Sequence, residues 1–286
     1  MTFEQQKEDF LKHFIPATLH EDIGAGDYTS QACIDPASKS HAKLLVKDFG
    51  VIAGVEVAER FFKTVDPDCV FEKKMTDGNN IRFGDVAFEV TCNTQALLKA
   101  ERSVLNTMQR MSGIATLANR FAFEVEDLPV KILDTRKTTP NLRFLEKWAV
   151  MLGGCQNYRS GLYDWIMIKD NHIDACGGIR QAIERIAAYQ QEKGLNLKVT
   201  IEVRNLNELD EVLSVGKVDR IMLDNFEIPL LRTAVNIIDK RFETEASGGV
   251  TIHNVRKIAQ TGVDFISVGA LTHSAQSLDL SLKISK

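Results

Sequence analysis

The second half of the chain alternates short apolar segments with segments whose apolar residues recur every three or four positions. Ile179, Ala182, Ile183 and Ile186, for example, have the period of a helix with one buried face. Short apolar segments that end in polar residues are typical of buried parallel strands. We expect such strands at residues 131–136, 165–169, 198–203, 220–223, 244–247 and 265–269. Their number falls short of the eight strands of a closed parallel α/β barrel, so the pattern predicts an incomplete, open barrel.

The first half of the chain has a different pattern. Residues 3–14 have one apolar helical face, and we expect Pro16 to end that helix. Strands are expected at residues 42–47 and 86–92, before a long helical stretch at 96–125 that Ser112-Gly113 interrupts. We therefore expect an α/β protein of two domains. An amino-terminal α+β sandwich-like domain covers residues 1–126, joined by the tail 275–286, and the open barrel covers residues 127–274.

Composition narrows the functional classes. The 286 residues suffice for a barrel with a second domain, and 44% hydrophobic with 26% charged residues is ordinary for a globular protein. A net charge of -4 disfavours a general nucleic-acid or membrane-surface role. No apolar run approaches the ~20 residues of a membrane span, and the amino terminus lacks a secretory signal pattern, so we expect a cytoplasmic protein. The five cysteines form no C-x-x-C pair, which predicts reduced thiols and no structural zinc.

Four basic residues stand at expected strand ends or in an adjoining loop, where barrel enzymes carry their chemistry. Arg136 ends the first strand and Lys137 follows it, Arg159 lies in the loop NYRSG, and Lys169 ends the second strand. In a chain that is acidic overall, such a cluster predicts a ligand with several negative charges, because guanidinium groups bind carboxylate or phosphate bidentately. Lys169 is also compatible with a Schiff-base nucleophile, as in barrel aldolases, or with a structural ion pair to Glu202.

Acidic and glycine-rich strand ends complete the candidate site. Glu202 and Asp224 end successive strands, and two such carboxylates fit a magnesium ion shared with substrate phosphates, a ribose diol, or ion pairs with the lysines. Ser247-Gly248-Gly249 and Gly269 follow the last two strands, where barrels often bind phosphate through backbone amides. His273 is placed to donate to the same phosphate. No Walker loop or G-x-G-x-x-G motif follows a strand, which disfavours nucleoside triphosphates and dinucleotides.

Several long runs resemble one enzyme family. They include ERSVLNTMQRMSGIAT (101–116), DTRKTTPNLR (134–143), EKWAVMLGGCQNYRSGLYDWIMIKDNH (146–172), IMLDNF (221–226), EASGGV (245–250) and ISVGALTHS (266–274), with HEDIGAGDYTS at 20–30. The chain is similar over nearly its whole length to nicotinate-nucleotide pyrophosphorylase, also called quinolinate phosphoribosyltransferase. The resemblance implies a decarboxylating pentosyltransferase of NAD biosynthesis, which converts quinolinate and phosphoribosyl pyrophosphate to nicotinate mononucleotide, pyrophosphate and carbon dioxide.

The resemblance also implies roles for individual residues and a homodimer or higher homo-oligomer. Quinolinate would contact Arg136, Tyr158, Arg159 and Lys169, with Arg102 donated across the subunit interface. Phosphoribosyl pyrophosphate would contact Lys137, Glu202, Asp224, Ser247, Gly248, Gly269 and His273. Of these, Glu202 and Asp224 would hold Mg²⁺, and the catalytic group would comprise Lys137, Lys169, Glu202 and Asp224.

Two positions depart from the family pattern. Tyr158 stands where the family commonly has histidine, and Cys155 where a glycine is expected. A phenol donates a hydrogen bond to a carboxylate but does not carry a positive charge near neutral pH. Tyr158 keeps open a related phosphoribosyltransferase-like protein with another substrate. A Schiff-base aldolase using Lys169 is a second alternative, and a catalytically silent binding or regulatory protein is a third, which the nearly complete set of matching charged positions disfavours.

Overall fold

A computed structural model describes residues 1–285 and divides the chain into two compact units. The first unit comprises Met1–Asn119, Thr139–Gly154 and the chain from Ala275 onward, and the second, here called the barrel unit, comprises Arg120–Thr138 and Cys155–Ser274. The division differs from the expected boundary after residue 126, because Thr139–Gly154 belongs to the first unit and residues 120–126 to the barrel unit. None of the described helices is long and apolar enough to span a membrane.

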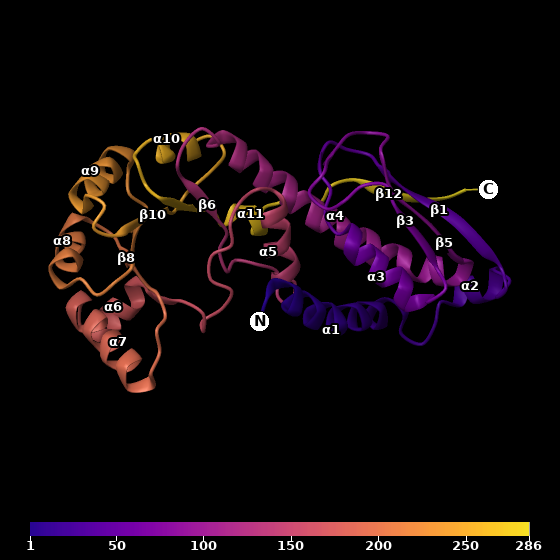
Figure 1. The fold of residues 1–286 in the computed structure, drawn as a ribbon, viewed down its shortest axis with the longest axis horizontal. Helices are drawn as coiled ribbons and strands as arrows, with labels where there is room; N and C mark the ends of the chain where they lie inside the picture. Colours follow the sequence, from indigo (N-terminus) through magenta and orange to yellow (C-terminus); the bar gives the residue numbers. More distant parts are fainter. Residues whose placement is uncertain (286) are drawn as a thin grey trace. The chain divides into compact units, whose positions relative to one another are not determined.

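The first unit is built on a four-stranded antiparallel sheet (Figure 1). Its inner strand β1 alternates buried and more exposed residues, so one face of the strand turns to the core. α3 packs against β3 and β5. The sheet order is β12 (Leu280–Ser285), β1 (Lys39–Val46), β5 (Val86–Asn93) and β3 (Val70–Lys73), with a separate pair, β2 (Gly50–Val51) and β4 (Asn80–Ile81). The helices are α1 (Phe3–Ile23), α2 (Tyr28–Cys33), α3 (Val55–Val65), most of α4 (Thr94–Glu124), and α5 (Arg143–Leu152).

Two expected helix breaks are wrong. α1 continues through Pro16 to Ile23, because Leu11, Ile15 and Leu19 form one buried stripe across the proline. This burial outweighs the one backbone hydrogen bond that proline removes. α4 likewise runs unbroken through Gly113.

Position 113 needs a glycine because another part of the chain packs closely against the helix there, and not because the helix bends. A Cβ atom at this position would lie 1.9 Å from the backbone oxygen of Gln276. The glycine therefore lets the chain that leads into β12 pass directly against the helix.

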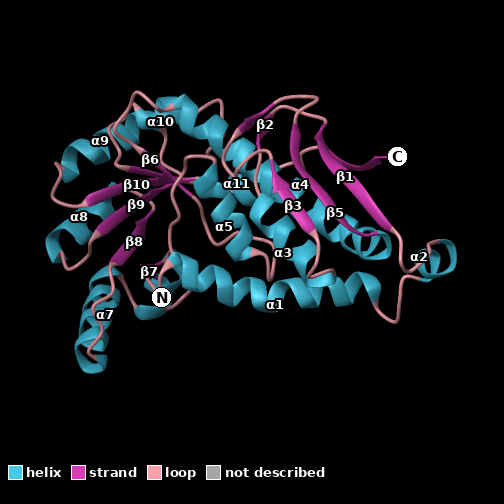
Figure 2. Ribbon diagram, turned by 45° about the vertical axis from the view of Figure 1, so that its right-hand side comes forward, coloured by secondary structure: helices cyan, strands magenta, loops and turns pink. Residues whose placement is uncertain are grey.

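The barrel unit contains a six-stranded, wholly parallel sheet, which confirms the expected open α/β barrel (Figure 2). β6 and β7 are its two ends and do not pair with each other, so the barrel is open between them. The strand order is β6 (Lys131–Leu133), β11 (Phe265–Ser267), β10 (Glu243–Ser247), β9 (Arg220–Asp224), β8 (Val199–Val203) and β7 (Ile166–Ile168). The helices are α6 (Asp170–Cys176), α7 (Ile179–Lys193), α8 (Leu206–Val215), α9 (Ile228–Ile238), α10 (Val255–Ala259) and α11 (Ala270–His273).

A short segment beside β6 lines the open edge. Gln156 forms a parallel bridge with Leu133, and its backbone N–H donates to the Ile132 carbonyl at 2.9 Å. Tyr158 follows two residues later and packs inside the barrel with Leu133 and Met222. The bridge therefore fixes the segment that carries Arg159.

Candidate active site

A cavity of about 760 Å³ lies within the barrel unit. Its walls are formed by the carboxyl ends of the strands and the loops that follow them, the position where parallel barrels bind their ligands. The lining residues are Thr135, Arg136, Lys137, Tyr158, Arg159, Met167, Lys169, Glu202, Met222, Asp224, Asn225, Ser247, Gly248, Gly249, Val250, Thr251, Ser267, Gly269, Ala270 and His273.

The cavity brings together every site residue expected from the sequence except Arg102. Arg102 lies on α4 in the first unit, where it lines a separate pocket of about 780 Å³. That pocket also contains Phe10 and Phe14 of α1 and Leu145 of α5. Its walls therefore combine apolar surface with the Arg102 guanidinium.

Two guanidinium groups face the cavity and have no carboxylate partner within residues 1–285. Arg159 is only 9% exposed, and no carboxylate of residues 1–285 lies within ion-pair distance of it. Burial lowers the pKa of Arg159, and repulsion from the Arg136 guanidinium lowers it further. The Nε atom of Arg136 is buried and lacks a hydrogen-bond partner. Two cations held close together in this way form a binding site for an anion, because an anion would supply the missing charge and acceptors.

A second cavity of about 610 Å³ adjoins the first and shares Arg136, Arg159, Met167 and Lys169 with it. Its remaining walls are mostly apolar and come from the loop before β7, from β7 itself and from α6 and α7. The cationic group therefore lies beside apolar surface, which suits a ligand that is both anionic and flat or apolar.

Lys169 and Glu202 form an ion pair at the ends of β7 and β8, with 3.0 Å between Nζ and Oε2. The lysine side chain is 45% exposed, whereas that of Glu202 is 9% exposed. A Schiff-base lysine needs a desolvated amine, so the exposure of Lys169 disfavours the aldolase alternative. The observed contact is the structural ion pair between Lys169 and Glu202, one of the possibilities that the sequence left open for this lysine.

Lys137 is held next to His273. The Thr272 hydroxyl donates to the Lys137 carbonyl at 2.8 Å, and Gly269 lies against both side chains. A Cβ atom on Gly269 would be 3.1 Å from Lys137 Cδ and from His273 Nε2. Glycine at this position therefore lets a cation and an imidazole converge on one side of the cavity.

The two acidic residues provide oxygen atoms on the same cavity wall. Asp224 accepts a hydrogen bond from the Asn225 side chain at 2.7 Å, and Glu202 is paired with Lys169. No group of three or more His, Cys, Asp or Glu side chains within residues 1–285 is arranged to hold a metal ion. Two carboxylates nevertheless fit Mg²⁺, which is usually bound by one or two carboxylates together with waters and substrate phosphates.

Gly248 permits the sharp turn after β10. Its φ is +93°, and a Cβ atom there would lie 2.1 Å from the Asn225 Oδ1 atom. The Asn225 backbone N–H donates to the Ser247 carbonyl at 2.8 Å, which ties the ends of β9 and β10 together. The turn therefore keeps one cavity wall free of side chains, as close approach of a phosphate requires.

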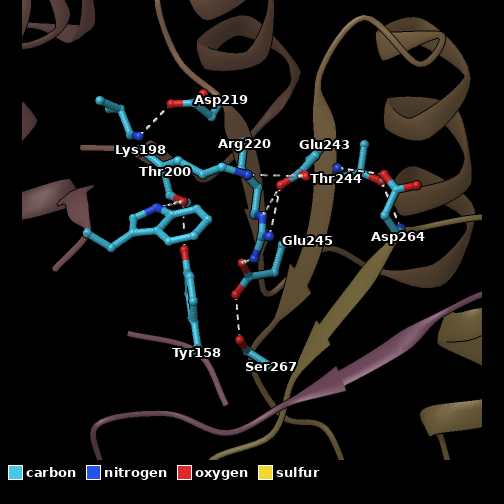
Figure 3. A network of polar contacts seen from close by, with 12 residues as sticks. Tyr158, Lys198, Thr200, Asp219, Arg220, Glu243, Thr244, Glu245, Asp264 and Ser267 are labelled. Atoms are coloured by element: carbon cyan, nitrogen blue, oxygen red, sulfur yellow. Dashed lines mark hydrogen bonds and ion pairs between the residues drawn. The ribbon is translucent and has the colours of Figure 1, made fainter. Parts of the chain in front are cut away.

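Tyr158 lines the cavity, but its hydroxyl hydrogen-bonds to Thr200 Oγ1 at 2.6 Å inside the barrel (Figure 3). Burial raises the pKa of the phenol, as does the nearby Glu245 carboxylate.

Cys155 is 5% exposed, and burial with the charge of Asp134 raises the pKa of its thiol to about 12. This value indicates that Cys155 is a packed residue and not a nucleophile.

Sequence reasoning assigned no role to several lining residues, chiefly Thr135, Met167, Met222, Asn225 and Ser267. Alternation along the strands was an available signal, since Met222 and Asp224 share a face of β9 and Ser267 and Gly269 follow the same alternation. The two methionines add apolar surface to a site that the sequence described only by its charges.

Comparisons with family models and with known proteins all point to the same enzyme family. Residues 27–112 match the amino-terminal domain of quinolinate phosphoribosyl transferase, and residues 114–283 match its carboxyl-terminal domain. A quinolinate phosphoribosyltransferase [decarboxylating] of Nicotiana glauca is 45% identical over 96% of this chain and 82% of its own length. A probable nicotinate-nucleotide pyrophosphorylase [carboxylating] of Bacillus subtilis is 40% identical over 98% of this chain and 93% of its own.

A solved structure supports the same assignment. The crystal structure of nicotinate-nucleotide pyrophosphorylase from Ehrlichia chaffeensis superposes with a TM-score of 0.91 at 37% identity, covering 96% of this chain and 98% of that one. Both domain profiles, the full-length relatives and the fold agree. The chain belongs to the quinolinate phosphoribosyltransferase family.

Proposed function

We propose that this protein transfers the phosphoribosyl group of phosphoribosyl pyrophosphate to quinolinate and decarboxylates the product to nicotinate mononucleotide. The observation that carries the proposal is the buried Arg159 next to Arg136, whose Nε atom is buried and unpartnered, with Lys137 and Lys169 in the same cavity. Quinolinate has two adjacent carboxylates on a flat ring, and it therefore matches a cationic group that borders apolar surface.

The roles of the cavity residues follow from their chemistry. Arg136 and Arg159 would bind the carboxylates and Lys169 would add a third positive charge, while Met167 and Met222 provide apolar surface to the cavity. The ring nitrogen would attack the anomeric carbon of the ribose as its bond to pyrophosphate breaks. Holding both reactants in one cavity supplies most of the required orientation.

Lys137 would stabilise the negative charge that develops on the departing pyrophosphate, while Ser247, Gly248, Gly269 and His273 hold the 5-phosphate. Once the nitrogen is ribosylated, the ring is cationic and accepts the electron pair of the breaking carbon–carboxylate bond. Carbon dioxide leaves and the ring carbon takes up a proton. The residues needed for this step are those that hold the ring away from water, and no general base is required.

We also propose Mg²⁺ as the cofactor, with Glu202 and Asp224 as its protein ligands. Both carboxylates line the cavity, and carboxylate oxygens are the ligands that a hard cation such as Mg²⁺ prefers. When bound, the ion supplies positive charge to the phosphate oxygens of the donor.

The active form is proposed to be a homodimer or higher homo-oligomer in which Arg102 reaches the cavity of the partner subunit. Arg102 lines an exposed pocket of the first unit and has no carboxylate partner within residues 1–285.

A cytoplasmic location is proposed as well. All five cysteines are free thiols, as is usual in a reducing compartment.

The direct test incubates purified protein with quinolinate, phosphoribosyl pyrophosphate and Mg²⁺ and follows nicotinate mononucleotide and carbon dioxide, with nicotinate as the control substrate. We expect the protein to convert quinolinate and to leave nicotinate unchanged. Folded protein that binds the donor but leaves quinolinate unchanged would favour a related phosphoribosyltransferase with another substrate, and Tyr158→His would then be the first variant to assay.

A further inference from the structure

A polar layer lies inside the barrel, one step below the cavity. Thr200 of β8 is the register partner of Arg220 of β9, and both are buried. Glu202 and Met222, which line the cavity, follow two residues later on the same strands. Because alternate residues of a strand point to the same face, Thr200 and Arg220 form the layer beneath these lining residues.

The Arg220 guanidinium is fixed from several sides (Figure 3). It donates to Glu243 Oε2 at 2.8 and 3.0 Å and to Glu245 Oε2 at 3.1 Å. Its carbon atom lies 3.7 Å from the ring centre of Phe265 and 5.1 Å from that of Tyr158. Arg220 therefore provides a rigid, charged surface against which the Tyr158 ring packs.

Tyr158 is held at both of its ends. Its backbone N–H donates to the buried carboxylate of Asp134 at 2.8 Å, and its hydroxyl bonds to Thr200 at 2.6 Å. Thr200 is fully buried and also accepts a hydrogen bond from the Trp165 indole at 2.8 Å. The phenol ring is thus pinned between the open edge of the barrel and strand β8.

Arg159 follows Tyr158 directly in the chain, and its guanidinium is buried without a carboxylate partner within residues 1–285. Burial and repulsion from Arg136 both disfavour the charged side chain at this position, and the more distant Asp164 and Glu245 oppose them. The backbone of Arg159 is held by the bridge between Gln156 and Leu133 and by the contacts of Tyr158.

We propose that Thr200 is a positioning residue, which acts through the Tyr158 hydroxyl to hold Arg159 in the cavity. The inference rests on the proposed function, in which Arg159 binds a quinolinate carboxylate. It assigns the Tyr158 hydroxyl to Thr200 and not to the substrate. Thr200 does not line the cavity, so any effect of its hydroxyl on substrate binding is indirect.

The experiment measures KM for quinolinate and for phosphoribosyl pyrophosphate separately in wild type, Tyr158→Phe, Thr200→Val and the double variant. We expect each single variant to raise the quinolinate KM by roughly tenfold and to leave the donor KM within about twofold, since displacement of a binding group affects the ligand that it contacts. The two effects should be less than multiplicative in the double variant, because both substitutions remove the Tyr158–Thr200 bond, although Thr200→Val also removes the acceptor of the Trp165 indole and Tyr158→Phe a contact with Glu245.

Two further variants separate positioning from general damage. Thr200→Ser keeps the hydroxyl and should restore the quinolinate KM. Thr261→Val removes a buried hydroxyl of the same unit that, within residues 1–285, bonds only to the Ile258 carbonyl, and it should leave both KM values unchanged. Effects of Tyr158→Phe and Thr200→Val that multiply in the double variant, equal rises in both KM values, or an unchanged KM in Thr200→Val would each overturn the proposal.

If Thr200→Val does not fold, calorimetric binding of quinolinate in an Arg159→Ala background decides the question. Positioning predicts that adding Tyr158→Phe to Arg159→Ala causes no further loss of affinity. A further loss would mean that the phenol touches the substrate, and the inference would be wrong. Absence of turnover in the wild type would instead reject the proposed function, so the two failures are distinguishable.

Discussion

Lys169 Nζ lies 3.0 Å from Glu202 Oε2, and this ion pair joins the ends of neighbouring strands at the wall of the cavity. The carboxylate is mostly buried, whereas the ammonium group is nearly half exposed. The lysine thus balances a buried negative charge and still has free donors for a ligand. One residue therefore connects the quinolinate side of the proposed site with its magnesium side.

Substitution of Lys169 tests this electrostatic role. Lys169→Gln should raise the KM for quinolinate at least tenfold and lower the free energy of unfolding by only about 1 kcal/mol, because the pair is partly exposed. Steady-state kinetics and urea titration measure the two effects. Mass spectrometry after borohydride treatment with quinolinate should find no adduct on Lys169 in the wild type, and an adduct would establish covalent chemistry instead.

Arg136 is expected to be essential for quinolinate and dispensable for the donor. Its buried Nε atom has no partner, so an anion is the natural acceptor. Arg136→Ala should abolish calorimetric binding of quinolinate and leave binding of phosphoribosyl pyrophosphate within a few-fold of wild type. Arg232→Ala, on the exposed side of α9, is the matched control. Equal loss of both ligands in Arg136→Ala would contradict the assignment.

Gly248 and Gly249 offer a matched pair for the phosphate side of the cavity. Both have positive φ, but a Cβ atom would meet Asn225 Oδ1 at 2.1 Å only at Gly248, and nothing lies within 4 Å at Gly249. Gly249→Ala therefore pays only backbone strain of about 1 kcal/mol. Gly248→Ala should in addition displace Asn225 and raise the donor KM tenfold or more. Similar KM values in the two variants would show that the Asn225 contact is unimportant.

Cys155 should resist alkylation. Its thiol has a pKa of about 12, raised by burial, so almost no thiolate is present at pH 8. Iodoacetamide at that pH should label the exposed Cys33 and leave Cys155 unmodified in peptide mass spectra of the folded protein. Labelling of both at similar rates would contradict the packing described for the segment beside β6.

The strands and the charged half of the site could be predicted from the sequence because their signals are local. A buried strand is a short apolar run, and the residue that ends it, such as Lys169 or Asp224, stands at the cavity wall. The breaks expected at Pro16 and Gly113 were wrong because tertiary packing decides both. The Tyr158–Thr200 bond joins residues 42 positions apart, and no periodicity relates a loop tyrosine to one strand threonine.

Asp77 allows a prediction on the pH dependence of stability. Its carboxylate accepts from the backbone N–H groups of Val55 at 2.8 Å and Glu56 at 3.2 Å, at the start of α3. Burial nevertheless raises the pKa of Asp77 above its ordinary value of 3.8, in spite of these hydrogen bonds. The folded protein therefore holds this proton more tightly than the unfolded chain does. The contribution of Asp77 to stability is fully present below pH 3.8 and is lost as pH rises through the raised pKa.

Asp77→Asn removes this titration and keeps an oxygen acceptor for α3. The free energy of unfolding of the wild type should therefore fall relative to that of Asp77→Asn as the pH rises from about 3.8 through the raised pKa, and the difference should become constant at higher pH. Urea titrations at several pH values measure it, and Asp68→Asn on the exposed surface corrects for loss of charge. If the wild type instead gains stability relative to Asp77→Asn with rising pH, the helix-capping hydrogen bonds outweigh burial and the pKa is lowered.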